Sequence, residues 1–374
     1  MPFIYCLLTG KLVKRERELH EKYGEIIRLA PDEVSFANEE AWNDIYNFRR
    51  GHKRAVRDKA YYVGWFPLLS IMDVAILTSI YIAPNDLADN LITTSDPKFH
   101  GRVRGLMSHS FTEDSLRNQH PLIHHHADML VDKLRQLAAA PQSLMEPGAL
   151  VNLTDWLNFF TMDVIGDLAF GEPFGCLETG EYHSWVRTLF SYLKGMSLAA
   201  APRYYPLTEK LFMKMIPQSV LEGQRQHTKY ASERILRRLE LKTDRPDFMT
   251  PFLRNNVNFE HMSKDEILST FNFIIVGGSE TTATTLTGIF NHLCKNERIL
   301  TRLCTEIRRR YGKEEDITID SIHDLPYLEA VLNEGLRMCN PIPGGLPRMV
   351  PEGGDTYCGK FLPGGVSSLL EPNQ

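Results

Sequence analysis

Two short motifs in the C-terminal half of the chain contain the residue types best suited to chemistry. Residues 277–282 read Gly-Gly-Ser-Glu-Thr-Thr inside a stretch that is otherwise apolar. Glycine costs about 1 kcal/mol relative to alanine inside a helix, so a pair there indicates a bulge or the close approach of a flat ligand. Glu280 and Thr281 could deliver protons to that ligand. The alternative is a structural polar patch whose hydroxyl groups bond to backbone carbonyls.

The second motif is the pair Glu334 and Arg337, three residues apart on one face of a predicted helix. Alone, such a pair is usually a surface ion pair worth less than about 1 kcal/mol. Its apolar neighbours predict partial burial, where a fork-shaped guanidinium group would make the pair a rigid structural clamp. These neighbours are Leu328, Val331, Leu332, Leu336 and Met338.

Three basic residues are candidates for anion binding. His100 and Arg104 lie four residues apart, hence on one helical face, and could together hold a carboxylate. Arg348, which follows a proline, is similar. The alternative is a solvated basic face that includes Arg102.

No metal site is predicted. Residues 124–126 are three histidines, but consecutive helical residues point about 100° apart, so they cannot converge on one ion and are expected to be solvated. The six cysteines show no C-x-x-C spacing, which excludes a structural zinc site and a disulfide framework and favours reduced thiols. They are Cys6, Cys176, Cys294, Cys304, Cys339 and Cys358.

Composition places the chain among ordinary globular proteins. It has 374 residues, 43% hydrophobic and 24% charged, and its net charge of -5 argues against nucleic acid as a partner. Residues 2–8 are apolar but too short to span a bilayer, which takes about 20 residues. Residues 61–82 are long enough, but Asp73 near their centre costs about 2.5–3.5 kcal/mol, which favours a buried or substrate-lining segment over a membrane span.

The N-terminal part predicts a small lobe that contains β-structure. A helix over residues 12–23 ends at Gly24, and short strands are expected over residues 25–29 and 33–36 around a Pro-Asp turn. Asn38 is a candidate cap for the next helix, with Trp42 and Ile45 on its inner face.

The rest of the chain predicts mostly helices. Asp96 and Pro97 begin one, and further helical patterns cover residues 121–137, 153–168, 183–193 and 219–239. Ser263 and Glu266 form a capping box for a long helix that runs to about Cys294. Two more helices are expected over residues 296–311 and from 324 to just before 341, and the last thirty residues predict turns and short strands.

Taken together and in this order, these motifs resemble the cytochrome P-450 superfamily of haem-thiolate monooxygenases. Residues 19–24, with Arg28 and Pro31, resemble its opening helix and first strands, and residues 99–104 resemble its C-helix. Residues 277–282, 306–308 and 334–337 are similar to its I-, J- and K-helix motifs. The local sequences of residues 280–284 and 335–338 are similar to those of fungal secondary-metabolism members.

The resemblance implies a mostly α fold with a small β lobe, as a single domain over residues 1–374. It also implies a haem cofactor and NADPH-dependent oxygenation of an apolar small molecule, with electrons from a partner reductase. The roles it implies are proton delivery by Glu280 and Thr281, propionate binding by His100, Arg104 and Arg348, cofactor contact at Gly277 and Gly278, and structural support from Glu334 and Arg337.

The sequence departs from the family pattern at three places. No N-terminal membrane anchor is present, although the family usually lies on the endoplasmic reticulum membrane, and residues 63–80 have no clear counterpart. The haem-ligand cysteine loop expected after residues 359–365 is absent, and Cys339 and Cys358 lack its context. These 374 residues are therefore expected to bind haem poorly and to be poorly active. The alternative to a monooxygenase is a haem-free, non-catalytic fragment or pseudoenzyme.

Overall fold

The computed structural model describes residues 5–6, 8–58, 89–139, 150–187, 218–241 and 243–370. The chain divides into two compact units, and each is described by itself. The first comprises Met1–Val103, Arg187–Lys229 and Ile342–Gln374, and the second comprises Arg104–Val186 and Tyr230–Pro341. The single domain expected over residues 1–374 stays a prediction.

No helix in the described parts of the chain combines the length and the apolar character that crossing a membrane requires. The stretch at residues 61–82 lies outside the described residues, as does most of the helix expected over residues 183–193.

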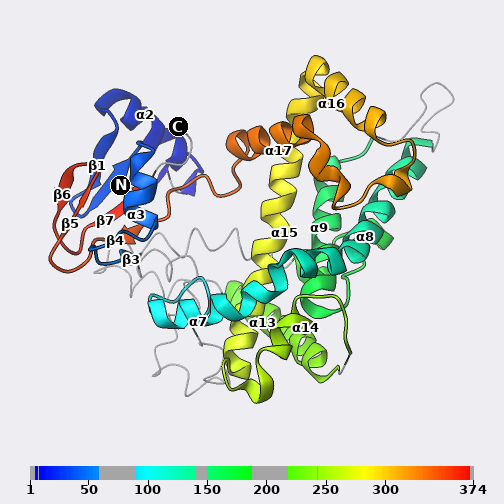
Figure 1. Cartoon of the computed structure of the whole chain (residues 1–374), viewed down its shortest axis with the longest axis horizontal. Coiled ribbons are helices and arrows are strands. Elements are labelled where there is room, and N and C mark those ends of the chain that lie inside the picture. Colours follow the sequence, from blue (N-terminus) through cyan, green and yellow to red (C-terminus); the bar gives the residue numbers. More distant parts are fainter. Residues whose placement is uncertain are drawn as a thin grey trace. The chain divides into compact units, whose positions relative to one another are not determined.

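A five-stranded sheet organises the first unit (Figure 1). Its strand order is β1-β2-β7-β4-β3, in which β2 and β7 run parallel and every other neighbouring pair is antiparallel. A separate hairpin pairs β5 with β6. The strands are β1 (Ile26–Ala30), β2 (Glu33–Phe36), β3 (Val56–Arg57), β4 (Arg348–Met349), β5 (Asp355–Tyr357), β6 (Lys360–Leu362) and β7 (Ser367–Leu370).

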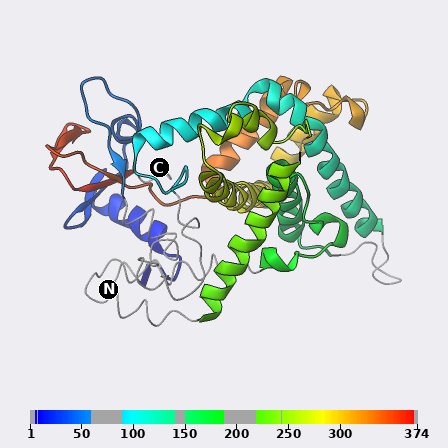
Figure 2. The same ribbon diagram turned by 90° about the horizontal axis from the view of Figure 1, so that it is seen from below.

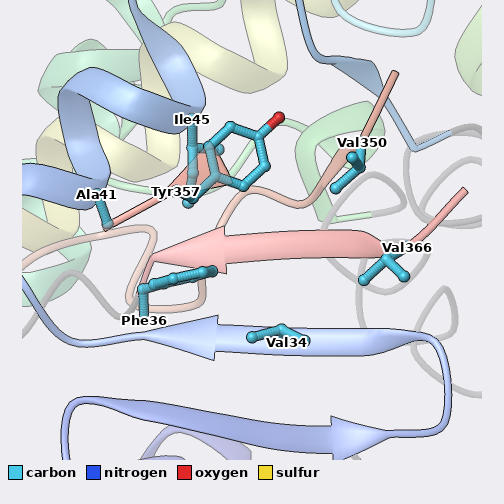
Figure 3. Packing of buried hydrophobic residues seen from close by; sticks show 7 residues of the cluster. All are labelled: Val34, Phe36, Ala41, Ile45, Val350, Tyr357 and Val366. Carbon is cyan, nitrogen blue, oxygen red and sulfur yellow. The ribbon is translucent and has the colours of Figure 1, made fainter. Parts of the chain in front are cut away.

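The core of the first unit combines segments from the N-terminal and C-terminal parts of the chain. Phe36 of β2 is fully buried and meets the ring of Tyr357 edge-on at 6.4 Å between centroids. The helices α2 (Leu12–Tyr23) and α3 (Glu40–Tyr46) pack against this sheet, and Ile45 of α3 is buried as expected. Trp42 on the same helix is 54% exposed, so its expected inward position is wrong. The cluster in Figure 3 contains Val34, Phe36, Ala41, Ile45, Val350, Tyr357 and Val366.

Helices make up the second unit, with α15 (Lys264–Lys295) packed along α9 (Leu153–Phe170) (Figure 1). The helices α7 (Pro97–Ser108) and α13 (Gln218–Glu240) each include residues of both units. Figure 2 shows α8 (Glu113–Ala139) and α13 along their length. The remaining helices are α10 (Cys176–Thr179), α14 (Met249–Arg254), α16 (Glu297–Arg310) and α17 (Pro326–Met338), with 3-10 turns at His109–Phe111, Val257–Phe259, Glu314–Asp316 and Ser321–Asp324.

Local signals account for most of these boundaries. The capping box is formed as predicted, with Ser263 accepting from the Glu266 backbone and the Glu266 carboxylate accepting from the Ser263 backbone. In α8 the prediction fails, because this helix begins at Glu113 and carries Pro121 inside it. The ring at Pro121 therefore lies within the helix instead of marking its start.

Buried charges connect the loop after α13 to the helices around it. Arg238 and Asp247 are almost fully buried and joined by two hydrogen bonds of 2.6 and 3.1 Å. Asp167 of α9 accepts from Arg245 and from His126 Nε2. His126 is only 3% exposed, so its expected solvation is wrong. The 100° spacing that keeps three histidines from converging points this one inward.

Candidate cofactor site

The Gly-Gly-Ser-Glu-Thr-Thr motif lies in the middle of α15, within the second unit. The Thr281 hydroxyl donates a 2.5 Å hydrogen bond to the carbonyl oxygen of Gly277, and Thr285 donates a 3.1 Å bond to the Thr281 carbonyl. Thr281 is half-buried and Glu280 is exposed. A threonine bonded to the carbonyl one turn earlier holds its hydroxyl in one direction and bends the helix slightly. The motif thus presents a fixed hydroxyl beside an accessible carboxylate.

The two glycines of the motif have different surroundings. At position 278 an added Cβ atom would lie 2.6 Å from Cδ1 of Ile165, so Gly278 permits the close approach of α9. At position 277 the nearest atom would be Cε1 of Phe273 at 3.4 Å, one turn earlier in the same helix. The packing role seen in the structure therefore belongs to Gly278. Among the described residues, no atom of another helix lies within 4 Å of a Cβ atom added at Gly277.

A small basic cavity lies in the first unit, and it contains two of the predicted anion-binding residues. His100, at the start of α7, and Arg348, in β4, both line this open cavity of about 40 Å³. Arg54 and Arg57 line it as well, together with Ala55, Val56, Thr94, Ser95, Asp96 and Pro97. The residues that line the cavity thus include three guanidinium groups and an imidazole, but one carboxylate. This set of hydrogen-bond donors suits an anion. The cavity has room for a few water molecules or for one carboxylate end of a larger ligand.

Hydrogen bonds and ring contacts position the cationic groups of this cavity. Arg57 of β3 pairs directly with Arg348 of β4, so both side chains leave the same face of the sheet. The Arg348 guanidinium lies over the ring of Tyr46, with Cζ 5.4 Å from the centroid. Arg57 Nη1 donates a 3.0 Å hydrogen bond to the carbonyl oxygen of Thr94, in the segment before α7.

Sequence reasoning missed Arg54 and Arg57. A signal was present, because residues 49–57 contain Arg49, Arg50, Lys53, Arg54 and Arg57 in a chain of net negative charge. Arg104 lies one turn after His100 on α7, is exposed, and belongs to the second unit. It does not line the basic cavity.

Glu334 and Arg337 form the predicted pair, but not the predicted environment. Arg337 Nε and Nη2 each donate a 2.7 Å hydrogen bond to the Glu334 carboxylate, which lowers the pKa of Glu334 and raises that of Arg337. Their side chains are 55% and 64% exposed. The expected partial burial is wrong, because the apolar neighbours that suggested it are themselves exposed: Leu332, Leu336 and Met338.

One face of α17 borders an open apolar groove of about 450 Å³ in the second unit. Glu334 lines this groove, together with Val331 and Met338 of α17 and Ile289 and Leu293 of α15. At the crossing of the two helices, a Cβ atom at Gly335 would lie 2.3 Å from Cγ1 of Ile289. The glycine therefore sets the close contact between α17 and α15.

Two cysteines, Cys176 and Cys358, lie in surroundings that disfavour a thiolate ligand. Burial raises the pKa of Cys176 to about 11, and burial followed by the negative charges of Asp44, Glu40 and Glu25 raises that of Cys358. Cys339 follows α17 and packs on Gly288 of α15, where an added Cβ would lie 2.3 Å from its sulfur. Within the described residues, no group of three or more His, Cys, Asp or Glu side chains could hold a metal ion.

Comparison with known proteins gives consistent matches over nearly the whole chain. The family described as Cytochrome P450 matches residues 78–366. Cytochrome P450 monooxygenase astJ of Aspergillus oryzae is 36% identical over 98% of this chain and 68% of its own length. Cytochrome P450 monooxygenases lcsI of Purpureocillium lilacinum and efuB of Hormonema carpetanum are each 34% identical, again over 98% of this chain, and over 67% and 68% of their own lengths.

Proposed function

This chain belongs to the cytochrome P450 family, and from that premise we propose that it holds a haem group and takes part in the monooxygenation of an apolar small molecule. Its mostly α fold with a small β lobe is the architecture of that family. The observation that carries the proposal is the basic cavity, which both His100 and Arg348 line.

The donor set of the cavity fits the anionic edge of a haem group. Guanidinium groups bind carboxylates in a fork geometry, and the cavity admits a carboxylate end but not the macrocycle. Arg348 is already oriented by its contact with Tyr46. In this proposal His100 and Arg348 bind the propionates, with Arg104 as a further contact from α7.

The residues of α15 are proposed to deliver protons and to line the cofactor. When bound, the haem group supplies the oxygen chemistry, which protein side chains cannot perform. The Thr281 hydroxyl donates its own proton to Gly277, so its oxygen would accept a hydrogen bond in a fixed direction and position a proton-carrying water molecule. The exposed Glu280 would exchange protons with that water. Gly277 leaves room for the cofactor beside the helix. The three apolar side chains just before Gly277 in α15 are only half-buried, which supports an apolar substrate. They are Phe273, Ile274 and Val276.

None of the six cysteines is proposed as the iron ligand. A thiolate ligand needs a lowered pKa or a cationic setting, and Cys176 and Cys358 have raised pKa values. These surroundings also favour a second candidate function, a non-catalytic protein of the same fold. Electrons would reach the catalytic form from NADPH through a partner reductase, as the resemblance implies.

The proposal is tested by titrating the 374-residue protein with haemin and following the Soret absorbance. We expect saturable binding with one haemin per chain, and weaker binding in Arg348→Met. Exposed Arg15 of α2, which pairs with Glu18, provides the matched control Arg15→Met, expected to leave binding unchanged. Absence of saturable binding in the unaltered protein would overturn the proposed haem site.

A further inference from the structure

Two histidines of α8 lie one turn apart on the same face of the helix. His120 and His124 are four residues apart, and their rings meet edge-to-face with 5.4 Å between the centroids. In zinc-binding helices, two histidines at this spacing bind one ion from a single face. This pair therefore differs from the run at residues 124–126, whose consecutive side chains point about 100° apart.

The separation of the two rings suits a shared metal ion. A bond between a metal ion and a histidine nitrogen is about 2.0–2.1 Å long, so the centres of two rings on one tetrahedral ion lie about 5 Å apart. The rings of His120 and His124 already lie near this distance. Small rotations of the two side chains can therefore bring their nitrogens to one ion without a change in the backbone of α8.

Asp128, one further turn along α8, prepares His124 for coordination. The Nδ1 atom of His124 lies 2.9 Å from the Asp128 carboxylate. Because an ionised carboxylate only accepts hydrogen bonds, Nδ1 carries the proton and Nε2 keeps its lone pair. Histidine ligands of metal ions commonly donate their other N–H group to a carboxylate, which fixes the ring and raises its basicity.

The nitrogens of both rings are available to an ion. His120 and His124 are half-buried, and the side chain of His124 is 33% exposed. Within the described parts of the chain, neither the His120 ring nor Nε2 of His124 has a hydrogen-bond partner. By contrast, His126 is buried and uses its Nε2 in a hydrogen bond to Asp167.

A cationic side chain close to this pair is itself neutralised. Arg117 lies one turn before the first histidine, where an unpaired positive charge would repel a metal ion. Its guanidinium group lies 3.0, 3.6 and 3.8 Å from three carboxylates, which belong to Asp320, Asp114 and Glu113. Asp128 adds a negative charge beyond the second histidine, so the charged groups on both sides are compatible with a dication.

We propose that His120 and His124 form a metal site on α8, with Nε2 of His124 and a ring nitrogen of His120 as the ligands. Water molecules complete the coordination sphere, as they do in open zinc sites. The ligand class is a divalent transition metal ion that accepts imidazole nitrogen: Cu²⁺, Ni²⁺ or Zn²⁺. Asp128 is a positioning residue that acts through His124. The site is independent of the proposed haem group.

The test is a calorimetric titration of the untagged, haem-free 374-residue protein with Ni²⁺. Ni²⁺ is the probe because imidazole suits this ion, whereas thiolates select Cu⁺ and Zn²⁺. We expect the tightest binding step to take up one ion per chain and to be lost in His120→Ala and in His124→Ala. In Asp128→Asn this step should be about tenfold weaker.

His125→Ala is the matched control, because His125 is an exposed histidine of the same helix that points about 100° away from His124. Its Ni²⁺ binding should equal that of the unaltered protein. Thermal unfolding gives a second readout, since an ion that binds the folded state raises the unfolding midpoint. Ni²⁺ should raise it in the unaltered protein and the control but not in the ligand variants. If His120→Ala does not fold, His124→Ala decides.

Each outcome bears on the proposed metal site. Tight binding that persists in both ligand variants, or that is lost in His125→Ala, overturns it. Absence of a tight binding step in the unaltered protein also overturns it and leaves the two rings as an edge-to-face contact without an ion. Unchanged affinity in Asp128→Asn, with loss in the ligand variants, supports the metal site and overturns the positioning role of Asp128.

Discussion

The hydroxyl group of Thr281 donates a 2.5 Å hydrogen bond to the carbonyl oxygen of Gly277, one helical turn earlier in α15. This bond fixes the direction of the hydroxyl group and satisfies a carbonyl within a motif that also carries an exposed carboxylate at Glu280. It links Thr281, for which we propose a role in proton delivery, with Gly277, for which we propose cofactor contact.

Replacing Thr281 by alanine should uncouple NADPH oxidation from product formation in a haem-loaded form of the protein to which the family's haem-ligand cysteine loop has been added. Without the fixed hydroxyl group, protons are misdirected, so peroxide is released in place of hydroxylated product. The measurement is the ratio of product formed to NADPH consumed. Thr284→Ala, an exposed threonine of the same helix, is the control and should retain the original ratio. An unchanged ratio in Thr281→Ala would remove this residue from proton delivery.

Two glycines of α15 should respond differently to alanine in the apo protein. Gly278→Ala places a methyl group 2.6 Å from Ile165 and should cost about 1–3 kcal/mol in the free energy of unfolding. Among the described residues, the methyl group of Gly277→Ala meets only Phe273, at 3.4 Å, so this variant should fold normally but bind haemin more weakly.

The control for these glycine variants is Gly105→Ala in α7, where no side chain or neighbouring element of the described residues lies within 4 Å of the added methyl group. It should raise stability by up to about 1 kcal/mol through helix propensity alone. Urea unfolding of all three variants checks the prediction. Equal effects at positions 278 and 105 would contradict the close approach of α9.

The exposed Glu334–Arg337 pair should contribute little to stability in these 374 residues. A double-mutant cycle with alanine at both positions should give a coupling no larger than that of Arg15 and Glu18. Those two residues form an exposed pair with the same three-residue spacing in α2. A coupling several times larger than the control would contradict the exposed position of the pair.

The first unit should lose stability as the pH rises through the range from about 4.5 to 7. Burial, followed by the negative charges of Asp58 and Asp32, raises the pKa of Glu33 from 4.5 to about 7. Within this range the folded state binds more protons than the unfolded state, so the free energy of unfolding falls with increasing pH. The effect should be on the order of 2 kcal/mol.

Glu33→Gln is the matched variant for this pH dependence, because it removes the titrating group and keeps the side-chain shape. Chemical unfolding at pH 5 and pH 8 should show the original protein losing stability relative to the variant between these values. A constant difference between the two proteins across the range would place the Glu33 carboxylate in water.

Much of the fold is readable from local sequence signals. The α2 boundaries, the β2 strand and the capping box at Ser263 follow from residues close together in the chain, and all three appear as predicted. The start predicted for α8 was wrong for a local reason too. Proline is common at the first position of a helix, but α8 accommodates Pro121 in its interior. Local signals fail where tertiary packing decides which side of a helix is covered.

The candidate site is less readable, because its members come from distant parts of the chain. Arg57 meets Arg348 only through the pairing of β3 with β4, and neither sequence neighbourhood reveals that register. The inward position of His126 and the outward position of Trp42 likewise depend on which helical face is covered by other elements. The apolar neighbours of Glu334 predicted burial, yet Leu332, Leu336 and Met338 among them are exposed in the structure.

The central claim is that this chain of the cytochrome P450 family binds haem and that none of its six cysteines supplies the iron ligand. The most direct test is the carbon monoxide difference spectrum of the reduced, haem-reconstituted 374-residue protein. We predict a spectrum without the red-shifted Soret band of thiolate ligation. Appearance of that band, and its loss on replacement of a single cysteine, would contradict the claim and identify that cysteine as the ligand.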